Sequence, residues 1–141
     1  MRNIKHSSAL RAIAAAATAA VLLAAPLATP ATASGTLGVT VTPGTPEGDL
    51  AVRTGLALFG LAQGASGSAQ VGQHGNGNAA GILQGGGGNL GVVHQQGNGH
   101  TGTLEQSGGG NAHGLFQFGE GAQGHVQQSG GETGVTVQVG F

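Results

Sequence analysis

The chain of 141 residues contains no cysteine, tryptophan or tyrosine, and only four phenylalanines. The missing cysteines exclude the disulfide framework on which many small secreted domains depend. With so few aromatic residues, the chain cannot close an ordinary aromatic and aliphatic core. Charged residues make up just 6% of the sequence. Any ordered structure must therefore bury mainly small, aliphatic and amide side chains.

The N-terminal part of the chain holds most of its positive charge, because three of the four basic residues lie within the first eleven positions. They precede an apolar, alanine-rich stretch over residues 13–27, and Ala31-Thr32-Ala33 forms a small-x-small cleavage site. This pattern predicts a secretory signal peptide over residues 1–33, with Ser34 as the start of the mature, secreted protein. A transmembrane anchor is disfavoured, because the apolar run is shorter than the roughly 20 residues of a spanning helix and Pro26 interrupts it.

The remainder of the chain is mildly acidic. After Ser34, Arg53 is the single basic residue against five acidic residues, which gives a net charge of −4 with histidine neutral. A chain without a basic stripe offers no electrostatic footing for nucleic acid, so we expect no nucleic-acid partner.

Glutamine recurs every eleven residues through the second half of the sequence. Two residues after each glutamine comes a glycine, and nine residues after it comes an aliphatic residue. A degenerate earlier unit has Ala62 in the glutamine position, with Gly64 and Val71 in register. Self-similarity at a fixed short period is typical of a repeat architecture. The glycines that set the turns in this frame are Gly64, Gly75, Gly86, Gly97, Gly108, Gly119 and Gly130.

One unit reads as a strand followed by a tight turn. The segment from Gly75 to Asn78 has turn chemistry, because glycine and asparagine tolerate positive φ. Asn78, Ala80, Ile82 and Gln84 are spaced by two, so they share one face of an extended strand. Two units make a 22-residue rung, and stacked rungs place glutamine over glutamine and asparagine over asparagine. The predicted fold is all-β, a two-sheet β-solenoid of 11-residue strand-turn units that is cross-β when assembled. An antiparallel up-and-down barrel is the competing geometry, but it requires nothing to recur in one register.

The inward columns of this frame define the candidate functional residues, which would form the core ladder of a fibre. Stacked amide side chains can hydrogen-bond along such a column, so their burial is not costly. The expected ladder residues are Gln73, Asn78, Ile82, Gln84, Asn89, Val93, Gln95, Leu104, Gln106, Asn111, Leu115, Gln117, Val126, Gln128 and Val137.

Residues 34–61 differ from the repeats and are interpreted as an N-terminal linker segment, followed by the repeat domain over residues 62–141. Within it, residues 36–42 alternate like a strand, and residues 50–61 fit a short helix or a capping strand. At the other end of the chain, residues 134–141 are strand-like, without charge or proline. We expect this last strand to be an uncapped edge that templates the addition of another copy.

The segment from Gln73 to Gln84 resembles the curlin repeat, Gln-x-Gly-x-x-Asn-x-Ala-x-x-x-Gln, at every specified position. Neighbouring units match in part, through Gln84, Gly86, Asn89 and Gln95, and through Gln106, Gly108, Asn111 and Gln117. The resemblance implies an extracellular, pilus-like cell-surface amyloid fibre of the biofilm matrix, with adhesion as its role. It also implies three partners: further copies of the chain, a curli-type nucleator or major subunit, and an outer-membrane secretion channel. The resemblance further implies a targeting role within residues 34–61, for the segment from about Ser34 to Leu50. The family's serine six residues before the glutamine is replaced here, for example by Asn78, which leaves major subunit and nucleator both open.

Other kinds of site are disfavoured by the same frame. The histidines after Ser34 occupy different columns, so we expect stacking to keep them apart and to build no metal site. His100 and His113 fall in inward columns and are interpreted as ladder substitutes. No cofactor, small-molecule substrate or enzymatic activity is expected, since neither a cysteine nucleophile nor a placed Ser-His-acid set is present. The rival function is a monomeric secreted solenoid that binds ice or polysaccharide on a regular array of stacked threonines, which this sequence lacks.

Overall fold

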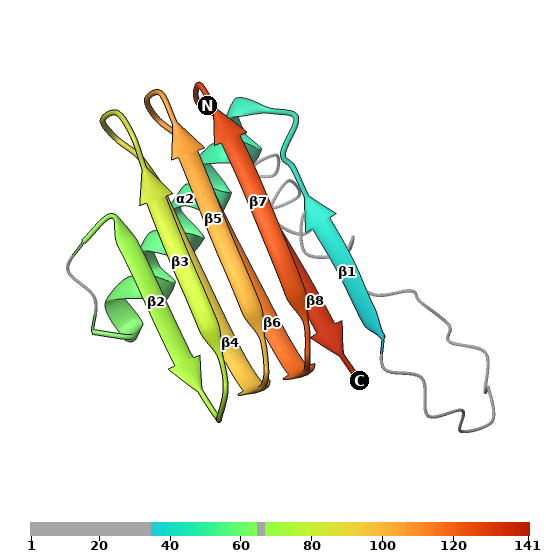
Figure 1. Cartoon of the computed structure of the whole chain (residues 1–141). Helices are drawn as coiled ribbons and strands as arrows, with labels where there is room; N and C mark the ends of the chain where they lie inside the picture. Colours follow the sequence, from blue (N-terminus) through green and yellow to red (C-terminus); the bar gives the residue numbers. More distant parts are fainter. Residues whose placement is uncertain (1–34, 65–66) are drawn as a thin grey trace, which may run out of the picture. The chain divides into compact units, whose positions relative to one another are not determined.

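A computed structural model describes residues 35–64 and 67–141, and the expected signal peptide lies outside these residues. In chain order the elements are β1 (Thr36–Val41), α2 (Pro46–Ala62), β2 (Ala69–His74), β3 (Ala79–Gln84), β4 (Leu90–Asn98), β5 (Thr101–Ser107), β6 (Ala112–Glu120), β7 (Gln123–Ser129) and β8 (Thr133–Gly140). The strands form a five-stranded sheet of order β1-β8-β6-β4-β2 and a three-stranded sheet of order β3-β5-β7 (Figure 1). Successive strands of the repeat alternate between the two sheets, which is the path of a β-solenoid.

The repeat length predicted from the sequence is confirmed by strand pairing. β2 lies parallel to β4 with Ala69 opposite Gly91, and β3 lies parallel to β5 with Ala79 opposite Thr101, an offset of 22 residues in both cases. β4 with β6, and β5 with β7, keep the same offset. Each rung is therefore a strand, a turn, a second strand and a second turn, and equivalent side chains of successive rungs lie directly over one another.

The interior between the two sheets is filled by the aliphatic column of the repeat. Val93, Leu104 and Leu115 are fully buried, and Ala80, Ile82 and Val126 pack against them. Such a core is narrow, because small residues occupy the neighbouring inward positions. A Cβ atom at Gly91 would lie 3.0 Å from the side chain of Leu104.

The last strand departs from the expected frame by one residue. β6 pairs with β8 at an offset of 21, so that Thr136 lies beside Leu115 and Gln138 beside Gln117. The inward position expected for Val137 is wrong, since its side chain is 39% exposed whereas that of Thr136 is 6% exposed. The reason is a shorter turn before β8, and a shift of one residue turns each side chain of a strand to the other face.

The expected uncapped edge at the C-terminus is also wrong. β1 pairs antiparallel with β8 along its whole length, from Thr36 opposite Gly140 to Val41 opposite Val135. Gly35 and Phe141 extend the ladder with two reciprocal backbone hydrogen bonds of 2.7 and 2.9 Å. The segment interpreted as a targeting or linker region therefore supplies a strand that covers the edge of the repeat.

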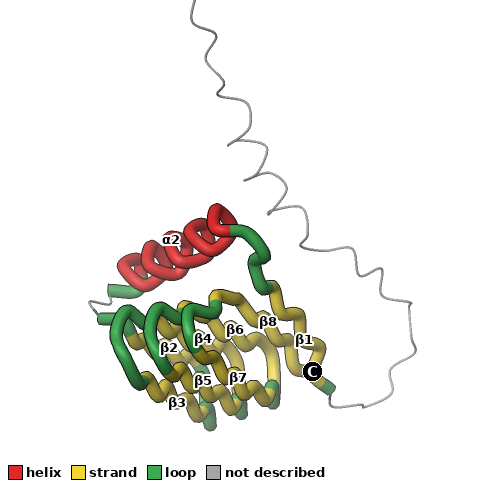
Figure 2. Tube along the Cα trace, turned by 90° about the horizontal axis from the view of Figure 1, so that it is seen from above, coloured by secondary structure: helices red, strands yellow, loops and turns green. Residues whose placement is uncertain are grey.

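The rest of residues 34–61, for which the sequence allowed a short helix or a capping strand, forms the helix α2. The side chain of Thr45 accepts a hydrogen bond from Gly48 N at 3.1 Å, Pro46 occupies the first turn, and acidic residues follow, which together make a favourable helix start. α2 packs on the outer face of the five-stranded sheet, where Leu56 contacts Val92 and Ala112 (Figure 2). Ala62 is its last residue, so the repeat strands begin only at Ala69.

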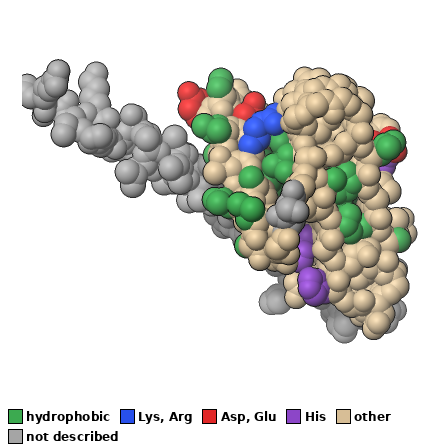
Figure 3. Space-filling model, turned by 90° about the vertical axis from the view of Figure 1, so that its left-hand side faces the viewer, with side chains coloured by type: hydrophobic (Ala, Val, Ile, Leu, Met, Phe, Trp, Pro, Cys, Tyr) green, Lys and Arg blue, Asp and Glu red, His purple; other side chains and the backbone are tan. Residues whose placement is uncertain are grey.

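The outer face of α2 is apolar as well. Leu50, Leu58 and Leu61 are 61–66% exposed, and Figure 3 shows hydrophobic side chains exposed beside the acidic and basic groups near the start of the helix. In the part of the chain that the structure describes, no helix has the length and apolar character needed to cross a membrane.

Candidate functional site: amide ladders and open strand edges

A glutamine ladder crosses the five-stranded sheet on its inward side. Gln73 Nε2 donates to Gln95 Oε1 at 2.7 Å, Gln95 Nε2 to Gln117 Oε1 at 2.8 Å, and Gln117 Nε2 to Gln138 Oε1 at 2.8 Å. Gln95 and Gln117 are fully buried. The ladder brings together three of the predicted residues and adds Gln138, which the eleven-residue frame had missed.

A second ladder crosses the three-stranded sheet. Gln84 Nε2 donates to Gln106 Oε1, and Gln106 Nε2 donates to Gln128 Oε1, both at 2.8 Å. Donation in both ladders runs toward the end of the solenoid that carries β7 and β8. The two ladders therefore share one direction along the stack.

The second amide proton of each ladder residue reaches across to the other half of the rung. Gln95 Nε2 donates to Ala79 O at 2.9 Å, Gln106 Nε2 to Leu90 O at 3.1 Å, and Gln117 Nε2 to Thr101 O at 3.0 Å. A buried amide is costly unless its donors and acceptors are paired. Here each inner amide nitrogen is paired along the stack and across it, so the ladders tie neighbouring rungs and both sheets together.

An asparagine column holds the turns in the same way. Asn89 Nδ2 donates to Gly85 O of its own turn at 3.1 Å and to Gly108 O of the next rung at 3.0 Å. Asn89 Oδ1 accepts from the backbone and side-chain nitrogens of Asn111 at 2.9 and 3.1 Å. Asn78 repeats the pattern one turn earlier, where its Oδ1 accepts from His100 N at 3.0 Å.

His100 occupies an asparagine position and reproduces asparagine chemistry. Its Nδ1 accepts from Ala122 N at 3.1 Å, as an asparagine Oδ1 accepts from the next rung. Its Nε2 lies 3.3 Å from Gln96 O, four residues back, where Asn89 Nδ2 contacts Gly85 O. This arrangement requires the neutral imidazole with its proton on Nε2. The side chain is fully buried, which agrees with its interpretation as a ladder substitute.

The asparagine column ends at Asn111. Its Oδ1 accepts from the backbone nitrogens of Gly131 and Glu132, both at 3.0 Å. The next turn has no asparagine, and the carboxylate of Glu132 instead accepts from Ser129 N at 2.8 Å. The shorter turn and the missing asparagine occur at the same place, which marks the last rung as an end.

The turn glycines of the frame all have positive φ, between 71° and 130°. Four of them lie in turns between strands, Gly97 and Gly119 lie near the ends of β4 and β6, and Gly64 follows the end of α2. At Gly97 the requirement is absolute, because a Cβ atom there would overlap the carbonyl oxygen of Gly119 in the next rung.

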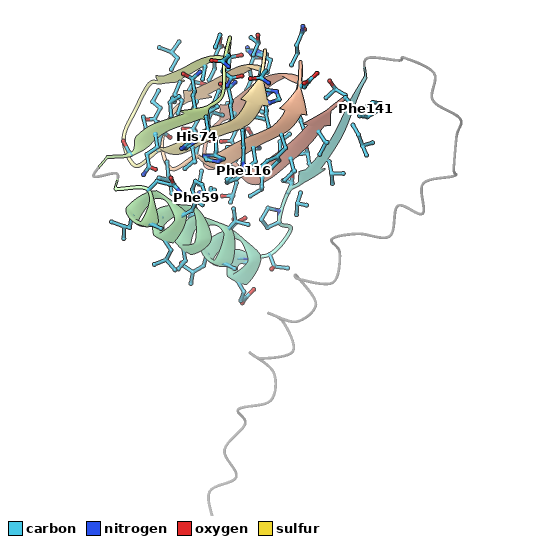
Figure 4. All side chains as sticks on the ribbon, turned by 90° about the horizontal axis from the view of Figure 1, so that it is seen from below. Phe59, His74, Phe116 and Phe141 are labelled. Carbon is cyan, nitrogen blue, oxygen red and sulfur yellow. The ribbon has the colours of Figure 1, made fainter. Side chains whose placement is uncertain are left out.

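The expectation that stacking keeps the histidines apart is wrong for one pair. The rings of His74 and His94 lie 5.6 Å apart on the outer face of the five-stranded sheet, where His94 also contacts Phe59 and Phe116 (Figure 4). The two histidines are offset by two residues along adjacent strands, since His94 lies opposite Gly72, but long side chains at such diagonal positions can meet. Burial, together with the charge of His74, lowers the pKa of His94 below its usual value.

Within residues 35–64 and 67–141 no three histidine or acidic side chains converge as metal ligands. The other inward histidine, His113, lies against β8, where its Nε2 is 3.0 Å from Thr136 Oγ1 and its Nδ1 has no partner. Burial lowers the pKa of His113 to about 4. It is held as a neutral interior side chain.

Three of the four ladder ends lie on strands with an open edge within the described chain: Gln73 on β2, Gln84 on β3 and Gln128 on β7, whereas Gln138 lies on β8, which β1 covers. β2 and β3 form the edges at one end of the solenoid, and β7 and β1 form the edges at the other. Such edges present backbone N–H and C=O groups that can pair with another strand. The chemistry available to the molecule is therefore strand addition, with amide ladders to continue the stack.

No protein-family model matches the chain, and no curated protein or solved structure matches it either. The likeness to the curlin repeat rests on the sequence motif alone.

Proposed function

We propose that this chain is a secreted structural subunit that self-assembles into extracellular cross-β fibres, which serve adhesion and the biofilm matrix. The observation that carries the proposal is the pair of in-register glutamine ladders, because both start on an edge strand, at Gln73 on β2 and Gln84 on β3, which a further rung would extend. Ladders of identical amides on a 22-residue rung are the arrangement that stabilises cross-β stacks.

The location and the remaining partners belong to the same proposal and are supported by sequence. The N-terminal 33 residues have signal-peptide character, and the curlin-like motif favours export through an outer-membrane channel. The same motif favours a partner of the nucleator or major-subunit kind.

Assembly is tested by following thioflavin T fluorescence of the purified chain and recording fibre diffraction from the product. We expect a sigmoidal rise and reflections near about 4.7 and 10 Å. Replacing Gln84 and Gln106 together with alanine should slow or abolish fibre formation, because it removes both side-chain hydrogen bonds of the ladder on the three-stranded sheet.

The matched control is the double replacement of Gln96 and Gln127 with alanine. Gln96 lies on β4 and Gln127 on β7, both on outward faces, and both side chains are exposed. If the inward and outward double variants assemble at the same rate, the ladders do not drive assembly. A chain that stays monomeric for days, with a β-rich circular dichroism spectrum, would contradict the fibre proposal and favour a monomeric binding solenoid.

A further inference from the structure

The two ends of the solenoid have different shapes. At one end β2 and β3 finish their sheets together, and we call this the flush end. At the other end β7 is the last strand of its sheet, while β8 and β1 extend the opposite sheet by two more strands, and we call this the stepped end (Figure 2). Among residues 35–64 and 67–141, no strand lies opposite β8 and β1.

The exposed edge of β7 has a defined set of backbone groups. Thr101 N donates to Ala122 O and Gly130 N donates to Ser107 O, so even-numbered residues of β7 face β5. The odd-numbered residues point their N–H and C=O groups to the open side. Gln123 O accepts from the Gln138 side chain at 3.0 Å and Ser129 N donates to Glu132 at 2.8 Å. The groups of His125 and Gln127 are left for a further strand.

The outer edge of β1 has the opposite parity. Reciprocal hydrogen bonds join Gly35 and Phe141, so the odd-numbered residues of β1 pair with β8. The backbone groups of Thr36, Gly38 and Thr40 consequently point to the open side. Every residue of β1 is exposed, including those whose side chains face the interior, because no strand of the described part of the chain lies opposite it.

We propose that the stepped end binds the stepped end of a second copy of this chain, with β1 of each molecule pairing parallel to β7 of the other. The two molecules would be related by a two-fold axis that is parallel to the strands and midway between the sheets. This rotation places the five-stranded sheet of one copy in line with the three-stranded sheet of the other. The two-strand overhang of each molecule then fills the two-strand gap of its partner, and both sheets become eight-stranded.

Strand direction and side-chain facing both agree with this pairing. β1 is antiparallel to β8 and runs in the same direction as β7 (Figure 1), and a two-fold axis along the strands preserves that direction. In a parallel ladder, a residue whose N–H and C=O point to the partner strand bonds to the two residues that flank the one directly opposite it. The odd residues of β7 would therefore bond to even residues of β1, and would lie directly opposite odd residues of β1. His125 and Val39 are both odd and both face outward, so inward side chains of the two strands also coincide.

A hollow at the stepped end is the space that the partner strand would cover. Its volume is about 500 Å³, and Thr40, His113, Val126 and Thr136 line it. Val126 is only partly buried, whereas its neighbour in the column, Leu104, is fully buried. The inward residues of β1 are threonine and glycine, which are small enough to lie over Thr136 and Gln138 of the partner's sheet.

A flush end cannot take this place. If β3 of another copy paired with β7, the β2 strand of that copy would occupy the position already held by β8. A stepped end therefore accepts a stepped end, and this contact closes at two molecules because the interface is reciprocal. Where the proposed fibres form, they would use this contact and a separate contact between flush ends in alternation.

Engineered cysteines test the pairing, since the full chain has none of its own. Val39→Cys is combined in turn with Gln123→Cys, His125→Cys and Gln127→Cys, and the purified proteins are oxidised and separated on a non-reducing gel. Adjacent strands lie about 4.8 Å apart, which is within the Cα separation of a disulfide. The two sites of one molecule lie on outward faces of opposite sheets, so they cannot bond internally.

We expect at least one pair to give a covalent dimer that carries two disulfides and does not grow further. Intact mass spectrometry checks this, because the product must weigh four hydrogens less than two monomers. Each single-cysteine variant serves as the control for random collisions. A ladder of trimers and longer products would show a head-to-tail contact and overturn the proposal, as would dimer yields no higher than those of the controls for all three pairs.

A second comparison leaves the cysteines out. Gly38→Pro removes an N–H that points to the open edge, whereas Gly38→Ala keeps it and its Cβ meets the Gln138 side chain at an ordinary 3.5 Å. By sedimentation, the proline should raise the dimer dissociation constant about tenfold or more, since the bond is lost twice in a two-fold interface. Equal dissociation constants for the proline and alanine variants would contradict the pairing.

This inference is separable from fibre formation. Closed dimers without thioflavin T-positive fibres would support the reciprocal contact and reject the proposed function. Fibres formed by a chain whose cysteine pairs never form disulfides would support the proposed function and reject the reciprocal contact.

Discussion

Gln95 is the side chain on which the ladder interpretation can be tested most directly. Its amide accepts from Gln73 and donates to Gln117 and to Ala79 O, at 2.7, 2.8 and 2.9 Å. Replacement by alanine removes the donor to the buried Gln117 Oε1 and the donor to the partly buried Ala79 O. At about 1–3 kcal/mol for each of these two groups, with about 0.8 kcal/mol for the lost methylene, the expected loss in the free energy of unfolding is about 3–7 kcal/mol.

The adjacent residue Gln96 is the control. It is the same residue type on the same strand, but its side chain is exposed, so Gln96→Ala should change the free energy of unfolding by less than about 0.5 kcal/mol. Urea denaturation followed by circular dichroism measures both variants. Gln95→Glu adds a sharper comparison, because it keeps the shape of the side chain but replaces the donor with a carboxylate oxygen. It should be at least as damaging as alanine near neutral pH. If Gln95→Ala and Gln96→Ala unfold at the same urea concentration with the same slope, the ladder contributes no stability and the reasoning is refuted.

Four further outcomes follow from the structure. Burial lowers the pKa of His113 to about 4, so between about pH 6.5 and 4 the unfolded chain binds a proton that the folded chain does not. The free energy of unfolding should fall over that range as the pH falls, by about 3 kcal/mol, and less steeply in His113→Gln; an unchanged slope in that variant would count against the assignment. His100→Asn should melt near the parent because asparagine supplies the same acceptor and donor, whereas His100→Ala should lose about 2–4 kcal/mol; equal melting of the two would contradict the substitution. Gly97→Ala should prevent or severely destabilise folding, while Gly81→Ala, where a Cβ meets nothing within 4 Å, should be tolerated, as thermal unfolding can show. Fibres built from alternating two-fold contacts have identical ends, so two-colour seeded growth should extend both ends at equal rates, and growth from one end alone would exclude that symmetry.

The repeat itself was predictable from the sequence because its signal is periodic. The spacing of the glutamines gave the 22-residue rung, and alternation by two placed Ile82 and Leu104 in the interior. Positive φ at the glycines followed from turn chemistry. Each of these features depends on residues close together in sequence, or repeated at a constant distance.

The features that were not predicted depend on contacts without a period. The alternation of residues 36–42 showed a strand, but nothing local indicated that β8 would be its partner 96 residues away, where Thr40 Oγ1 contacts Thr136 Oγ1. The diagonal contact of His74 with His94 required the actual length of the side chains. The inward position of Gln138 could have been predicted from the sequence. Gln138 is followed two residues later by Gly140, as Gln117 is followed by Gly119, but this pair lies one position earlier than the eleven-residue frame requires.

The one-residue shift and the strand β1 together explain how such a chain can be an ordered single molecule. A perfect repeat would leave inward amides and valines at both ends, and each end would invite the next rung. Here the shorter turn moves Thr136 and Gln138 inward, the asparagine column stops at Asn111, and β1 then covers β8. The covering is incomplete because only one of the two sheets is extended, so the edge of β7 stays open. A solenoid capped on one sheet alone cannot stack head to tail. However, the capping strand β1 has the direction and the hydrogen-bonding parity to pair with the open edge of β7 in a second copy. The strand β1 can therefore both block head-to-tail stacking and complete the sheets of a dimer, provided that the partner is a second copy rotated about a two-fold axis parallel to the strands.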